Sequence, residues 1–259
     1  LLKMKEEGII RHVGFSTHAP LKTIVNAIET GLFDFVNLHY YYFNQRNAAA
    51  VEAAKNRDLG VFIISPNDKG GQLFKVPAKV KNAVKPLTPI QWNARFCLQN
   101  SGIHTLSFGL THATQFAEMK GIFPVQWTNS EQKIQAKLDG FLADDPYSDF
   151  DGFELANDPS GINIPEILLL RKLWKCYNMS SFGKYRYKTF EDRSHWLPGE
   201  QAFKEHIDKI DLSAVPENIP LKKLLDEAHR KFYITPFQRK VNNFFYKVKW
   251  KLSKLIAEK

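Results

Sequence analysis

The sequence has 259 residues, of which 44% are hydrophobic, and it carries a formal net charge of +9. This length is sufficient for one large domain or for two smaller domains with cores of their own. No apolar run approaches the roughly 20 residues that a membrane-spanning helix needs, and no signal-peptide pattern is visible.

The positive charge is concentrated at one end of the sequence. Residues 235–259 contain seven Lys or Arg and one Glu, and therefore supply +6 of the net +9. The basic balance is a property of this tail and not of the body. Because the body is not basic, we do not expect a nucleic-acid partner.

The sequence contains two cysteines, Cys97 and Cys176, and each stands beside apolar residues in a helical pattern. Two separated cysteines do not make a disulfide framework, which favours a cytoplasmic location. We predict that both are buried and unreactive thiols.

Four apolar, strand-like runs are each followed by a helical pattern in the first half of the sequence. The expected strands are 12–16, 33–40, 60–65 and 103–109, and the expected helices are 21–31, 45–58, 88–100 and 112–121. Thr88 is suited to cap the third helix, and Pro89 fits its first turn. Continuous apolar strands that alternate with helices predict an α/β fold with a parallel sheet buried on both faces. A doubly wound sheet and half of a (β/α)8 barrel both fit, and both bind ligands at the carboxyl ends of their strands.

The pattern changes near residue 130. A helix is expected over 130–144, and a turn-rich acidic stretch follows over 144–161. The acidic residues lack the order of an EF-hand loop, so a solvated linker is expected and not a calcium site. Further helices over 162–178 and 219–232 predict a second, helical module.

Small polar residues follow the first expected strand directly. Ser16, Thr17 and His18 either cap the next helix or face a ligand. We interpret His18 as a loop residue and His39 as a residue that lines the sheet. Consecutive tyrosines at 40–42 should alternate between the two faces of a strand, with at least one of them in the core.

Four segments in order resemble the second half of an aldo/keto reductase. They are GIIRHVGFSTHAP (8–20), FDFVNLHYYYFNQRN (33–47), GVFIISPNDKGGQL (60–73) and HTLSFGL (104–110). The resemblance covers about residues 1–118. It implies strands 5–8 of a (β/α)8 TIM barrel, which binds NADPH at the carboxyl-terminal mouth.

The resemblance also implies which residues contact the nicotinamide. Ser16 matches a serine that binds the carboxamide of the cofactor, and Thr17 stands where an asparagine is usual. Asn37 matches a glutamine with the same role, since an amide can donate and accept hydrogen bonds at once. Ile64 replaces a tyrosine that commonly stacks on the ring.

The phosphate side of the cofactor is matched by a second set of residues. Ser65, Gly70 and Gly71 correspond to the loop that passes over the pyrophosphate, where glycine allows close backbone approach. Gly109 corresponds to the turn near the adenosine phosphate. The basic residues that often follow it are not evident, so the choice between NADPH and NADH stays open.

The catalytic residues of the family (Asp, Tyr, Lys and His) lie on its first four strands, and this sequence begins on the helix before the fifth. We therefore assign no catalytic residue. We expect a fragment of an NADPH-dependent oxidoreductase that transfers hydride to a small carbonyl substrate, with its catalytic tetrad upstream. The alternative is a non-catalytic, degenerate relative that serves as a binding or membrane-associated module.

Residues 159–233 resemble the ferredoxin-like module of a subgroup of this family. Its cluster cysteines correspond to Asp149, Gly152, Leu155, Asp158, Glu205, Asp208, Asp211 and Val215. Because none of these is a cysteine, we expect neither an iron–sulfur cluster nor another metal. The expected layout is a partial barrel (1–118), connecting helices (119–145), a degenerate ferredoxin-like domain (146–233) and a basic tail (234–259).

Apolar residues in the tail recur at helical spacing from Val241 to Ile256, with lysines beside them. This pattern predicts an amphipathic C-terminal helix. Two interpretations stay open: the helix packs on the body, or residues 235–259 make peripheral contact with an anionic membrane.

Overall fold

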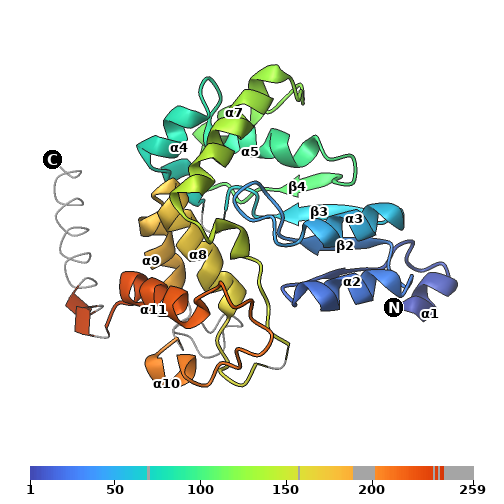
Figure 1. The fold of residues 1–259 in the computed structure, drawn as a ribbon. Coiled ribbons are helices and arrows are strands. Elements are labelled where there is room, and N and C mark those ends of the chain that lie inside the picture. The colour runs from blue at the N-terminus through green and yellow to red at the C-terminus, as the bar shows by residue number, and fades with distance from the viewer. Residues whose placement is uncertain (69–70, 157, 189–201, 236, 239, 242–259) are drawn as a thin grey trace. The chain divides into compact units, whose positions relative to one another are not determined.

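The computed structural model describes residues 1–68, 71–156, 158–188, 202–235, 237–238 and 240–241 (Figure 1). The chain divides into two compact units, one formed by residues 1–154 and 172–179, the other by residues 155–171 and the residues from 180 onward. The predicted C-terminal helix falls almost wholly outside the described residues. Within the described part, no helix is both long and apolar enough to cross a membrane.

The first unit is built on a four-stranded parallel sheet whose strand order follows the chain: β1 (Gly14–Ser16), β2 (Phe35–Leu38), β3 (Gly60–Ile64) and β4 (Thr105–Ser107). The parallel α/β arrangement predicted from the sequence is therefore confirmed. A doubly wound sheet reverses its strand order at a switch point, and this sheet has no such reversal. The topology fits a run of consecutive strands in a (β/α)8 barrel.

Helices follow the strands as the periodicity predicts. The helices of the first unit, with the short 3-10 helices marked η, are α1 (Leu2–Glu6), α2 (Leu21–Glu29), α3 (Ala48–Asn56), η1 (Gln72–Lys75), α4 (Ala78–Ala83), α5 (Pro89–Leu98), α6 (Ala113–Lys120), α7 (Asn129–Asp139), η2 (Gly140–Asp144) and η3 (Ser148–Phe150). Of these, α4, η1 and η3 were not predicted, whereas η2 continues α7 within the helix expected over 130–144.

One face of the sheet is buried at its centre, and Phe15 and Leu106 on its edge strands are half-buried. Its alternate residues Val36, Leu38, Val61 and Ile63 have no exposed surface. Helix α3 packs against β3 and against α2, whose Ile24 and Ile28 are also buried. Burial of these aliphatic side chains is the main source of stability in this layer.

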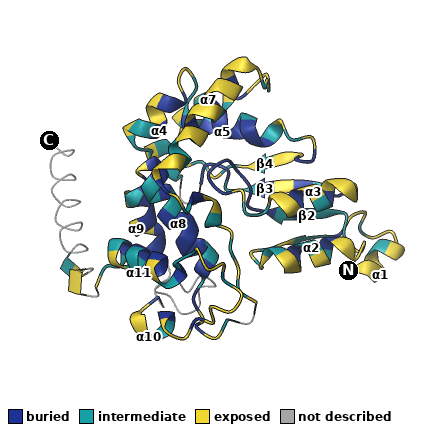
Figure 2. Cartoon of the chain, viewed as in Figure 1, coloured by how far each residue is buried: buried dark blue, intermediate teal, exposed yellow. Residues whose placement is uncertain are grey.

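The opposite face, called here the open face, differs from the prediction made from the strand pattern, whereas half of a barrel is expected to leave its inner face bare. We expected burial on both faces, yet Ser16, Phe62, Thr105 and Ser107 are exposed. Exposed positions on β3 and β4 are visible in Figure 2. In the described residues the sheet has two free edges, β1 and β4, and does not close on itself. A face that points into a barrel is buried only when the barrel is closed, which explains why these strands keep one solvated side.

Helix α5 begins as the sequence predicts. The Thr88 hydroxyl accepts a hydrogen bond from the Gln91 backbone N–H at 3.2 Å, and the Gln91 side chain accepts from the Thr88 N–H at 3.1 Å. Pro89 occupies the first turn, where its missing N–H costs nothing. Most of the helix is buried, including Trp92 and Asn93.

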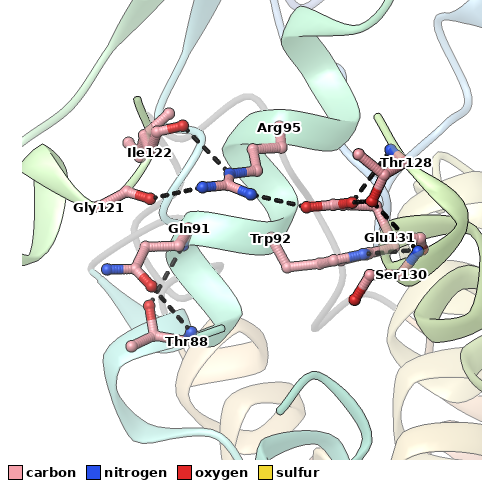
Figure 3. Close-up of polar contacts among 9 residues, drawn as sticks. All are labelled: Thr88, Gln91, Trp92, Arg95, Gly121, Ile122, Thr128, Ser130 and Glu131. Carbon is pink, nitrogen blue, oxygen red and sulfur yellow. Dashed lines mark hydrogen bonds and ion pairs between the residues drawn. The ribbon is translucent and has the colours of Figure 1, made fainter. Parts of the chain in front are cut away.

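A largely buried ion pair anchors α5 to the first turn of α7 (Figure 3). Arg95 donates to a Glu131 carboxylate oxygen at 2.6 Å and to the carbonyls of Gly121 and Ile122. The other Glu131 oxygen accepts from the Thr128 N–H and hydroxyl. Burial raises the pKa of Glu131, but its hydrogen bonds outweigh burial and hold the pKa at about 2.

The second unit contains the first half of α8 (Ile164–Tyr177), α9 (Ser180–Lys188), α10 (Lys204–Ile207) and α11 (Leu221–Phe232). All regular structure among its described residues is helical, in agreement with the predicted helical module. A buried Arg186–Glu166 pair at 3.1 Å lies in its core. Its identification with a ferredoxin-like domain stays a prediction.

Replacement of Glu131 by Gln removes the countercharge of buried Arg95 and should lower the unfolding free energy at pH 7 by about 2 kcal/mol. Because the folded-state pKa lies below the unfolded value of about 4.5, the carboxylate stabilises the fold above pH 4.5. This contribution is lost as the pH falls toward 2. Chemical denaturation between pH 7 and 3 measures the effect. An E131Q variant as stable as the wild type at pH 7 contradicts it.

Candidate functional site

The carboxyl ends of the four strands meet at one edge of the sheet because all the strands are parallel and adjacent. Across the open face near this edge, Ser16 pairs with Asn37, Asn37 with Phe62, and Phe62 with Thr105. We call these four residues the cross-strand row. The sequence-predicted residues Ser16 and Asn37 are therefore direct neighbours.

The amide oxygen of Asn37 is the least satisfied group in this row. It is shielded from solvent, and none of the described residues donates a hydrogen bond to it. A buried acceptor without a donor costs roughly 1–3 kcal/mol. Buried polar groups in folded proteins usually have partners, so this oxygen is an unusual feature of the open face.

Apolar rings fill the part of the open face next to the row. The ring of Phe35 lies over Gly14, so that a β-carbon on Gly14 would meet a ring carbon at 2.4 Å. Phe35 also packs against Phe62, with ring centroids 5.4 Å apart. A planar ligand on the cross-strand row would therefore lie beside an aromatic surface.

Two histidines lie beyond the cross-strand row, toward the loops. The His39 ring nitrogen Nδ1 lies 3.1 Å from the Ile64 carbonyl oxygen. A carbonyl only accepts, so Nδ1 carries the proton. His18 stacks on His39 with centroids 4.9 Å apart. His18 is exposed and His39 is buried, which agrees with a loop position for the first and a lining position for the second.

The three consecutive tyrosines are all buried, but each reaches a different environment. Tyr40 stacks on Phe96, and burial raises its pKa to about 12. The Tyr41 hydroxyl donates to Asp68 at 2.8 Å, and the Tyr42 hydroxyl donates to Asp139 at 2.7 Å. The strand ends at Leu38 and a tight turn pairs Tyr41 with Asn44, so simple two-face alternation does not apply.

The remaining predicted residues lie in the loops that follow the strands. Ser65 continues the β3–β4 ladder through its N–H to the Ser107 carbonyl, and its φ is +52°. Gly71 has φ +69°, a left-handed conformation that favours glycine, whereas Gly70 lies outside the described residues. The Thr17 hydroxyl accepts from the Ala19 N–H at 3.0 Å and shapes the turn before α2.

Gly109 is different from Gly71. A β-carbon on it would meet no atom within 4 Å, so packing within the described residues does not require glycine there. The Gly109 carbonyl accepts from the Asn67 side chain at 2.9 Å. This bond ties the loop after β3 to the loop after β4.

Side-chain amides that the sequence analysis did not identify, two of them buried, hold these loops together. Asn93 bridges the loops after β2 and β3, Asn67 joins β3 to β4, and Asn47 donates to the His39 carbonyl at 2.8 Å. Asn93 offered one signal: it is a poor helix former between the apolar residues of α5. The asparagines in the loops offered none.

No cluster of three or more His, Cys, Asp or Glu that could hold a metal occurs among the described residues. Three carboxylates at positions that the resemblance compares with cluster cysteines have local partners: Asp208 binds Lys204, Asp211 accepts from the Ser213 N–H, and Asp158 accepts from Ser160. The other Asp158 oxygen, Oδ1, is buried and has no partner among the described residues.

Both cysteines are buried, as predicted. Burial raises the pKa of Cys176 to about 11 and raises that of Cys97 as well. Both side chains therefore stay protonated at neutral pH, which disfavours reactivity.

No protein-family model matches the chain, and no curated protein matches its sequence. Among solved structures, the chain is similar to the apo form of the aldo-keto reductase AKR11C1 from Bacillus halodurans, with a TM-score of 0.45 and 17% sequence identity. The match covers 52% of this chain and 53% of that chain. The chain thus spans about half the length of this reductase.

Replacement of Gly14 by Ala should destabilise the first unit by about 1–3 kcal/mol, because the new methyl group overlaps the Phe35 ring. The matched control is Gly109→Ala, where the methyl group enters open space and the change should stay within about 0.5 kcal/mol. Urea denaturation compares the two variants. Equal stabilities would show that Phe35 does not occupy this position in solution.

Proposed function

We propose that the carboxyl edge of the sheet binds NADPH, with the nicotinamide carboxamide on Ser16 and Asn37. The resemblance of residues 1–118 to the second half of an aldo/keto reductase suggests this cofactor. The observation that carries the proposal is the direct pairing of Ser16 with Asn37 on the open face, together with the unsatisfied amide oxygen.

The chemistry of the two side chains fits a carboxamide. A carboxamide offers two N–H donors and one carbonyl acceptor, and serine and asparagine can each donate and accept. The Asn37 oxygen lacks a donor that the NH₂ group of the ligand can supply. Because this oxygen is shielded from solvent, a ligand reaches it only after a neighbouring side chain moves.

The loops after β3 and β4 are suited to the phosphate end of the cofactor. Gly109 leaves open space where a side chain would stand, so the backbone there is accessible to a bulky group. Ser65 supplies a hydroxyl on the adjacent loop, which Asn67 ties to Gly109. Thr17, Gly70 and Gly71 belong to the proposed contact surface by resemblance alone.

NADPH, when bound, supplies a hydride to a small carbonyl compound. The residues of this chain would hold the cofactor and orient its ring beside Phe35 and Phe62. The resemblance assigns the proton donor to strands that this sequence does not include, so the residues described here bind and position only. The alternative, a non-catalytic, degenerate relative that serves as a binding or membrane-associated module, differs in lacking carbonyl reduction.

Titration of the full chain with NADPH, followed by cofactor fluorescence, should show saturable binding. Ser16→Ala and Asn37→Ala should each weaken it about 5- to 30-fold, the effect of one or two hydrogen bonds. Asn37→Ala also removes a buried unsatisfied oxygen, so its unfolding temperature should stay equal or rise while affinity falls. A fall in affinity without a fall in unfolding temperature distinguishes a binding role from a folding role.

Ser101→Ala is the control for this titration, because Ser101 is exposed in the turn before the amino end of β4. It should leave the affinity unchanged. The proposal fails if the wild type shows no saturable binding, or if both site variants bind as the wild type does.

A further inference from the structure

We propose that Asn93 is a positioning residue that fixes the loops after β2 and β3 relative to each other, and through them the carboxyl edge of the sheet. Its effect on NADPH affinity rests on the proposed function above. Its effect on the loops does not, because the contacts that carry it are made within the chain.

The side chain of Asn93 links two loops by hydrogen bonds. Its amide oxygen accepts from the Tyr42 backbone N–H at 3.0 Å, and its amide nitrogen donates to the Pro66 carbonyl at 2.6 Å. Tyr42 belongs to the loop after β2 and Pro66 to the loop after β3. The side chain has no exposed surface, so water does not compete for either bond.

Asn93 lies on a helix that is itself held in place by hydrogen bonds. Arg95, two residues further along α5, is fixed by Glu131 and by two backbone carbonyls (Figure 3). The capping box of Thr88 and Gln91 fixes the start of the same helix. Side chains held by such packing position a site more accurately than loop residues do.

The loop that Asn93 holds needs external support. Ser65 and Asp68 both have positive φ, +52° and +54°, which costs free energy for residues other than glycine. The bond from Asn93 to Pro66 lies between these two residues in the chain. Asn67, also between them, passes the constraint to Gly109 after β4. Asn93 thus contacts two of the four strand exits directly, and Asn67 links the second of these to a third.

An asparagine that only stabilised the fold would give a different result when replaced. Its loss would destabilise the fold, and ligand affinity would fall only as far as any equal destabilisation lowers it. Glu131→Gln offers that comparison, because it weakens the anchorage of α5 without touching either loop. The two variants are compared at a temperature at which both are folded.

The experiment measures Asn93→Ala, Glu131→Gln and the wild type by hydrogen–deuterium exchange and by NADPH titration. In Asn93→Ala, the segments 40–47 and 65–68 should exchange at least tenfold faster than in Glu131→Gln, and NADPH affinity should fall at least fivefold below that of Glu131→Gln. If Asn93→Ala does not fold, Asn93→Asp replaces it: the carboxylate still accepts from the Tyr42 N–H but cannot donate to the Pro66 carbonyl, so faster exchange is expected over 65–68.

Each result supports or overturns the proposed role of Asn93. Equal exchange in the two loops of both variants overturns the positioning role, and faster exchange with an affinity equal to that of Glu131→Gln overturns its importance for the site. If the wild type does not bind NADPH, the proposed function fails, while faster exchange in Asn93→Ala still supports the role of Asn93 in positioning the two loops.

Discussion

Parallel pairing of four consecutive strands is the constraint on which the rest of the structure depends. It brings four separate loops to a single edge, and the strand register alone aligns Ser16 with Asn37. Hydrogen bonds of the ladder fix this register, and the aliphatic layer beneath it holds the strands in place. The polar side chains therefore need little further organisation to form a common surface.

The two faces of the sheet contribute differently, since one supplies stability and the other carries the residues of the proposed site. Val36, Leu38, Val61 and Ile63 stabilise the fold on one side. The other side carries side chains that contribute little to burial, and one of them, Asn37, leaves an acceptor unsatisfied. A residue that costs stability in the free protein is understandable where a ligand group completes its hydrogen bonding.

Much of the fold could be predicted from the sequence because its signals are local. The strand and helix patterns around β1 to β4 depend on residues close together in the sequence. The same is true of the cap formed by Thr88 and Pro89. The half-solvated sheet could not be predicted in this way, because apolar residues such as Phe62 look the same whether or not a neighbouring layer covers them. The candidate site was only partly foreseeable: the strand exits mark Ser16 and Asn37, whereas Asn93 and Asn67 act through contacts distant in sequence.

The three adjacent tyrosines have a consequence for how this chain can change in evolution. Tyr40 reaches α5, Tyr41 the loop after β3, and Tyr42 the end of α7. A deletion or insertion of one residue here would shift every ring into a pocket shaped for its neighbour. Substitutions can be absorbed one at a time, but the length of this segment cannot drift.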